Sequence, residues 1–154
     1  MTTLTQIQGF LGHKRVAIVG VSRNPRDFTR TLFQEFRRRE YDAVPVNPVV
    51  NEVDGQRCYA HVADIKPPVE GALLMTNPAV TEQIVRECHD AGIRNIWIYG
   101  GAGAGAVSPA AVKFCEAERL SIVAGECPFM FFPETMWFHR LHGFCRKVLG
   151  MYPK

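Results

Sequence analysis

The chain has 154 residues, nearly half of them apolar, which is enough for one substantial core and too short for two domains of usual size. Its 18 basic and 15 acidic residues are interspersed and leave a net charge of +3, which does not favour a nucleic-acid partner. No apolar run is long enough to span a membrane and the first residues lack the pattern of a secretory signal, so we expect a cytoplasmic protein with no membrane partner.

The first half of the chain alternates apolar runs with one amphipathic stretch. Residues 15–20, RVAIVG, are a β-branched run that ends in glycine and predicts a strand buried on both faces. Residues 28–39 place apolar side chains at helical spacing opposite arginines, which predicts a helix. Residues 42–46, DAVPV, predict a second strand, and Pro45 within it indicates an edge position. Residues 47–61 are expected to form a loop.

The second half continues the same alternation. Apolar runs predict strands at residues 69–76, 95–99 and 120–124, and helical spacing predicts helices at residues 81–91 and 107–118. A glycine-rich turn precedes the second of these helices. Strands and helices that alternate with short connections predict an α/β fold with a doubly wound, mainly parallel sheet of five strands.

The end of the chain departs from this rhythm. Residues 126–133 are rich in proline and phenylalanine, and residues 134–149 predict a last helix that packs across the sheet. We therefore expect a single domain, residues 1–154, with a core of about residues 14–128 and a C-terminal helical extension of residues 129–154. The aromatic side chains of the extension predict core packing or the contact of a homodimer: Phe129, Phe131, Phe132, Trp137 and Phe138.

The turn after the first predicted strand is the best candidate for phosphate binding. Ligands of open α/β sheets bind beyond the carboxyl ends of the strands. The segment GVSRNPR would bring backbone N–H groups, the start of a helix and two arginines to a phosphate, or else form an ordinary turn with solvated arginines. NAD(P) binding is disfavoured because Ser22 and Pro25 interrupt the GxGxxG pattern and Asn47 replaces the acidic residue that holds a ribose hydroxyl.

An ordered series of motifs resembles one known family. The segments VAIVGVSRNPRD, VPVNP, DGQRCYAHVADI, a strand ending in TNP, and NIWIYGG are similar to stand-alone CoA-binding proteins with a Rossmann-like fold, related to the CoA-binding domain of the succinyl-CoA synthetase α subunit. The resemblance covers about residues 14–128 and implies binding of coenzyme A or an acyl-CoA. It implies a site built by the turns after the first four strands: Gly20, Val21, Ser22, Arg23, Arg26, Asn47, Pro48, Thr76, Asn77, Pro78, Tyr99 and Gly100.

The cysteines and histidines of the chain suggest rival chemistry. Cys127, His139, His142 and Cys145 could ligate a metal, but their spacing matches no recognised zinc pattern, so we predict no metal site. Cys127 with a histidine base could also act in thiol or acyl transfer, although buried inert cysteine is the commoner case. With no convincing acid, base and nucleophile, we predict a ligand-binding or regulatory module and keep an enzyme of unknown reaction as the alternative. All five cysteines are expected to be reduced.

Overall fold

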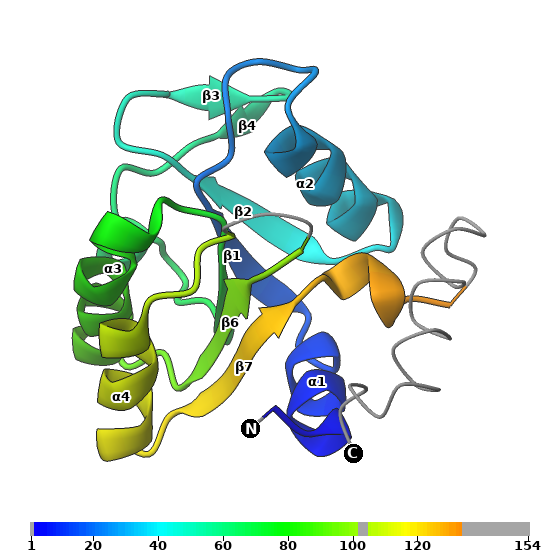
Figure 1. Ribbon diagram of the computed structural model, residues 1–154. Helices are drawn as coiled ribbons and strands as arrows, with labels where there is room; N and C mark the ends of the chain where they lie inside the picture. Colours follow the sequence, from blue (N-terminus) through cyan, green and yellow to red (C-terminus); the bar gives the residue numbers. More distant parts are fainter. Residues whose placement is uncertain (1, 102–104, 134–154) are drawn as a thin grey trace.

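Five parallel strands form one sheet (Figure 1) in a computed structural model that describes residues 2–101 and 105–133. From edge to edge the strands are β2 (Asp42–Val46), β1 (Arg15–Val19), β5 (Gly71–Leu74), β6 (Asn95–Tyr99) and β7 (Ser121–Glu126). The chain therefore runs outward in one direction from β1 to β2 and in the other from β5 to β7. The predicted doubly wound, Rossmann-like α/β fold is confirmed.

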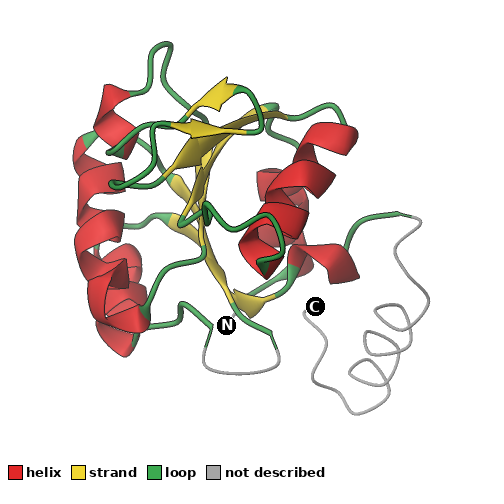
Figure 2. Ribbon diagram, turned by 90° about the horizontal axis from the view of Figure 1, so that it is seen from above, coloured by secondary structure: helices red, strands yellow, loops and turns green. Residues whose placement is uncertain are grey.

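Helices cover both faces of the sheet, as Figure 2 shows. One face carries α1 (Leu4–Leu11) and α2 (Phe28–Arg38), and the other carries α3 (Pro78–Asp90) and α4 (Pro109–Ala117). Successive strand residues point to opposite faces, so Ile18 of β1 joins the core under α1 and α2 while Val19 joins the core under α3 and α4. Because both faces of the sheet are buried in a core, every residue along a strand can be apolar, which explains the uninterrupted apolar runs of the strands. No helix within the described ranges is long and apolar enough to cross a bilayer.

Pro45 lies on the edge strand, as predicted. Its carbonyl faces away from β1 and accepts a hydrogen bond from Tyr59 N at 3.0 Å, so the missing N–H of the proline also faces outward and costs no ladder bond with β1. Tyr59 O in turn accepts from Asn47 N at 2.9 Å. A short stretch around Tyr59 thus covers the end of the β2 edge.

The structure contains elements that the sequence patterns did not predict. Helix α1 precedes β1, and a hairpin of β3 (Glu52–Val53) and β4 (Gln56–Arg57) occupies the segment expected to be a loop. Two single turns of 3-10 helix follow, η1 (Val62–Asp64) and η2 (Pro128–Met130). The hairpin lies beside α2 and beyond the end of β2, so it extends the carboxyl edge of the sheet (Figure 1).

The aromatic residues after β7 belong to the core as far as the structure describes them. Phe129 and Phe132 are buried, and the Phe132 ring packs edge-on against Phe36 of α2 at 5.2 Å between centroids. The core alternative is therefore confirmed for these two side chains. The predicted helix at 134–149, which includes Trp137 and Phe138, lies outside the described residues.

We expect Leu73→Ala to lower the free energy of unfolding by about 2–5 kcal/mol, because the fully buried Leu73 would leave a cavity between the sheet and the two helices above it. Chemical denaturation measures the change, and Val49→Ala is the matched control because Val49 is 78% exposed. Equal losses in the two variants would contradict the assigned core.

Candidate functional site

A cavity of about 260 Å³ opens where the strand order reverses between β1 and β5. This is the crevice in which open α/β sheets bind their ligands. The cavity is smaller than a typical pocket for a drug-sized molecule, roughly 300–1,000 Å³, so it suits one end of a larger ligand. Its walls come from the ends of three strands, from η1 and from α3: Val19, Gly20, Val46, Pro48, Ala60, His61, Val62, Thr76, Val80, Gln83, Ile84 and Glu87. Of these, Gly20, Pro48 and Thr76 were predicted site residues.

Gly20 is required at the floor of this cavity. Its φ is +95°, and a Cβ placed on it would lie 2.6 Å from the carbonyl oxygen of Met75. Its own N–H donates to Val46 O at 2.9 Å. Any larger residue would therefore strain the backbone and push β1 away from the chain that leaves β5.

Polar side chains stand at one wall of the otherwise apolar cavity. His61 Nδ1 lies 3.4 Å from Glu87 Oε2, and Gln83 Nε2 donates to Glu87 Oε1 at 3.2 Å. These groups offer donors and acceptors to a heterocyclic base or a sugar. Sequence reasoning missed all three, although His61 lies inside one of the motifs that carried the resemblance and the other two occupy one face of α3.

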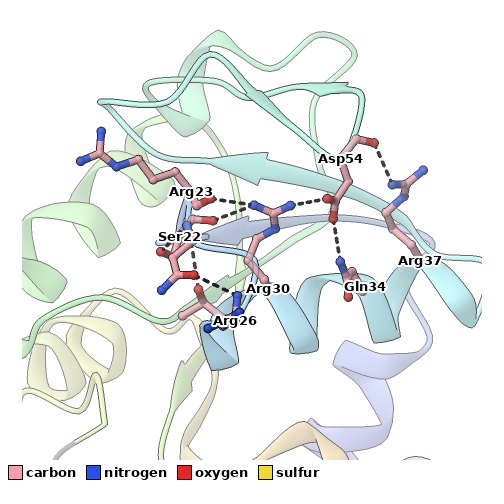
Figure 3. Close-up of polar contacts among 9 residues, drawn as sticks. Ser22, Arg23, Arg26, Arg30, Gln34, Arg37 and Asp54 are labelled. Carbon is pink, nitrogen blue, oxygen red and sulfur yellow. Dashed lines mark hydrogen bonds and ion pairs between the residues drawn. The ribbon is translucent and has the colours of Figure 1, made fainter.

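The turn after β1 satisfies most of its own backbone donors (Figure 3). Ser22 N donates to Thr29 Oγ1 at 2.9 Å, Asn24 N to Ser22 Oγ at 3.1 Å, and Arg26 N to Asn24 Oδ1 at 3.0 Å. The predicted cradle of N–H groups is thus already engaged within the turn. The exposed guanidinium groups of Arg23 and Arg26 are the donors that the turn presents to solvent.

The start of α2 is capped by a carboxylate. Asp27 Oδ1 accepts from the backbone N of Thr29 at 2.9 Å and from Thr29 Oγ1 at 2.8 Å. Because this negative charge already occupies the positive end of the helix, the N-terminus of α2 is a weaker phosphate site than the pattern suggested. A phosphate at this turn would therefore have to be bound mainly by arginine side chains.

Four further predicted residues have structural roles. Asn47 ties the first two turns together, since its Nδ2 donates to Val21 O at 2.9 Å. Val21 is fully buried in the core. Asn77 caps α3 by accepting from Ala79 N at 2.9 Å, and Pro78 occupies the first helical position, where a missing N–H costs nothing.

Tyr99 and Gly100 lie at the same edge of the sheet but do not line the cavity. Gly100 packs against the chain at Gly125, where a Cβ would come within 2.4 Å of the Gly125 Cα. The Tyr99 ring lies 5.5 Å from the ring of Phe28, which is 40% exposed. Burial, with Cys127 beside the ring, raises the pKa of Tyr99 to about 12, so the phenol is neutral at physiological pH.

Cys127 does not have the surroundings of a nucleophile. Its side chain is 6% exposed, and burial raises its pKa although Phe129 and Tyr99 offer it hydrogen bonds. A thiol with a raised pKa is mostly protonated at neutral pH and reacts slowly. His139, His142 and Cys145, the proposed partners of Cys127, lie outside the described residues.

The comparison with known proteins points to one family. The model of a family described as "CoA binding domain" matches residues 14–133. The chain is 25% identical over 81 residues to an ADP-forming acetate–CoA ligase of Methanocaldococcus jannaschii, covering 53% of this chain and 12% of the ligase. It is 26% identical over 90 residues to the alpha subunit of ADP-forming acetate–CoA ligase II of Pyrococcus furiosus, covering 58% of this chain and 20% of that subunit. The chain thus matches a small part of these relatives.

A solved structure has the same α/β fold as this chain. A protein from Pyrococcus horikoshii OT3, described as hypothetical, superposes with a TM-score of 0.75 and 27% sequence identity. The match covers 83% of this chain and 87% of that one. Similarity therefore extends over almost the whole of a small protein and over one segment of the much longer ligases.

We expect Cys127 in the folded protein to be alkylated by iodoacetamide far more slowly than a free thiol, because its raised pKa and burial leave little accessible thiolate. Peptide mass spectrometry of a neutral-pH time course resolves each cysteine separately, and the same chain in denaturant is the control. Alkylation of native Cys127 at the denatured rate, blocked by added CoA, would instead favour thiol chemistry at this position.

Proposed function

The chain belongs to the CoA binding domain family, and from this membership we propose that it binds coenzyme A or an acyl-CoA at the carboxyl edge of its sheet. The observation that carries the proposal is the cavity at the reversal of strand order, inside the matched residues 14–133. Three turns that the resemblance assigns to the ligand meet there, at Gly20, Pro48 and Thr76.

The parts of the ligand find matching chemistry along this edge. The apolar walls of the cavity would hold the adenine, with His61 and Glu87 within reach of its polar atoms. The exposed guanidiniums of Arg23 and Arg26 would pair with phosphate oxygens, for which arginine has the best geometry. The pantetheine arm would then run toward the aromatic pair of Phe28 and Tyr99.

A ligand-binding or regulatory module agrees better with the site than an enzyme does. The ligases that the chain resembles are much longer than the matched segment, which is 12% of one and 20% of the other. The described part of the site holds a capped helix start, a neutral phenol, a buried thiol and the His61–Glu87 pair. No hydrogen bond among the described residues joins His61 to a serine, threonine or cysteine side chain, so these groups do not compose a nucleophile with its base. We therefore propose binding without chemistry.

The location and assembly of the chain are also proposals. A cytoplasmic location agrees with four buried free thiols at Cys58, Cys88, Cys115 and Cys127. A homodimer rests on Trp137, Phe138 and the half-buried Phe131, because Phe129 and Phe132 are buried within the chain itself.

We expect CoA to bind with micromolar or tighter affinity and NAD to bind much more weakly. Asn47 stands where a dinucleotide site has an acidic residue for the ribose, and its amide donates a hydrogen bond to Val21 O. The turn after β1 also lacks the second glycine of the dinucleotide fingerprint. Isothermal titration calorimetry with both ligands under the same buffer measures the difference. Equal affinities, or a preference for NAD, would move the chain to the dinucleotide binders.

We expect Arg26→Ala to weaken CoA binding while the fold stays intact, because Arg26 is exposed on the turn and its side chain supports no core contact. Loss of one charged hydrogen bond costs roughly 1.5–3 kcal/mol, which corresponds to a tenfold to hundredfold rise in Kd. Arg94→Ala is the matched control, since it removes the same charge just before β6, at the amino end of the sheet. An unchanged Kd in Arg26→Ala would mean that this arginine is only solvated.

A further inference from the structure

Arg30 is a buried arginine that joins the turn after β1 to the β3–β4 hairpin. It lies in the first turn of α2 and is 7% exposed. Its Nη1 donates to the backbone carbonyls of Ser22 and Arg23, both at 3.2 Å, and its Nη2 pairs with the carboxylate of Asp54 (Figure 3). One guanidinium therefore holds two segments that are more than twenty residues apart in the sequence.

One face of α2 grips the hairpin through the same aspartate. Asp54 lies at the hairpin turn with a φ of +50°, followed by Gly55 at +75°. Gln34 Nε2 donates to Asp54 Oδ2 at 3.0 Å, and Arg37 Nη1 donates to the Asp54 carbonyl at 3.3 Å. Because Arg30, Gln34 and Arg37 follow one another at helical spacing, they form a single row along α2 (Figure 3).

The ion pair persists at neutral pH. Partial burial opposes ionisation of Asp54, but the hydrogen bonds from Gln34 and Arg30 prevail and lower its pKa below the usual value. Arg30 Nε is buried without a hydrogen-bond partner among the described residues, which adds to the free-energy cost of burying this cation. Removing the carboxylate would leave the guanidinium still less compensated.

The arrangement controls what the turn presents to a ligand. Carbonyl oxygens carry negative partial charge and would repel a phosphate if they pointed at it. Arg30 holds the carbonyls of Ser22 and Arg23 on the inner side, while the Arg23 side chain extends away from Arg30 in the opposite direction (Figure 3). The carbonyl oxygens on the inner face of the turn are thus paired with the Arg30 guanidinium, and the outer face carries the exposed side chains of Arg23 and Arg26.

We propose that Arg30 and Asp54 are positioning residues, through which the β3–β4 hairpin braces the turn after β1 in the conformation that receives phosphate. The inference rests on the proposed CoA site and adds to it a part of the chain that does not line the cavity. Arg30 itself is buried and its two terminal nitrogens are already engaged by Ser22 O, Arg23 O and the Asp54 carboxylate, so it is poorly placed to bind a phosphate directly. The hairpin acts on the ligand only through the turn.

The test is Asp54→Asn, which keeps the size of the side chain and removes its charge. We expect a Kd for CoA that is about three- to thirtyfold higher than in the wild type. In the ligand-free protein, we expect faster hydrogen exchange at the amides of Ser22, Asn24 and Arg26, because the hydrogen bonds of these amides form only when the turn has the observed conformation. Asp54→Glu, which restores the charge, should recover most of the affinity and of the protection.

Asp42→Asn is the matched control. Asp42 pairs with Arg15 at the amino end of β1, so this variant breaks another, more exposed Arg–Asp pair at the opposite edge of the sheet. It should change neither the Kd for CoA nor exchange in the turn. If Asp42→Asn reproduced the effects of Asp54→Asn, the effects would be global and the positioning role would be overturned.

The outcomes separate this inference from the proposed function. A wild-type chain that binds CoA and an Asp54→Asn variant that binds it equally well would overturn the positioning role and leave the CoA site standing. A wild-type chain that does not bind CoA would remove the proposed function. In that case exchange alone decides whether the hairpin braces the turn: faster exchange in Asp54→Asn supports the brace, and unchanged exchange overturns it.

Discussion

The candidate site depends on one point of the backbone, the step from Val19 to Gly20 at the end of β1. There the chain is tied to both neighbours, since Gly20 N donates to Val46 O and Val19 O accepts from Met75 N, both at 2.9 Å. Beyond it the connections leave on opposite faces of the sheet, with α2 on one and α3 on the other. Because the connections that follow β1 and β5 diverge from two hydrogen-bonded strands, they leave a crevice between them. The Met75 carbonyl lies so close to Gly20 that no side chain fits at the floor of this crevice.

Most of the fold was predictable because strands and helices of this kind are encoded by local patterns. The boundaries of β2 and β6 match the predicted ones, and Pro45 marked the edge strand. Helix α1 and the hairpin were missed, although each had a local signal. Thr3 and Gln6 form a capping box, and Asp54-Gly55 is a favoured hairpin turn. Both elements are short, so neither shows the periodicity on which the prediction relied.

The site was less predictable than the fold because it depends on which helix face meets which loop. The turns after the strands could be placed from the strand ends, and the resemblance to the CoA-binding family assigned Gly20, Pro48 and Thr76 within them to the site. The wall contributed by Gln83 and Glu87 requires the rotation of α3 about its axis, and that rotation is set by packing against the sheet. The arginines of α2 were expected opposite its apolar face, and Arg30 is nevertheless buried because an unpredicted hairpin packs against it.

The arginines near the first turn therefore divide into two kinds by burial rather than by sequence. Arg23 and Arg26 are exposed, so water compensates their charge, and in the proposed site a phosphate would take the place of that water. Arg30 has lost that water, so the protein itself must compensate the charge, with two carbonyls and a carboxylate drawn from separate segments. Other conformations of the turn would leave the buried guanidinium without these partners and would therefore be higher in free energy. A buried Arg30 needs the Ser22 and Arg23 carbonyls as hydrogen-bond partners, and this need holds the turn in one conformation. A turn that is already ordered before the ligand binds loses less conformational entropy on binding.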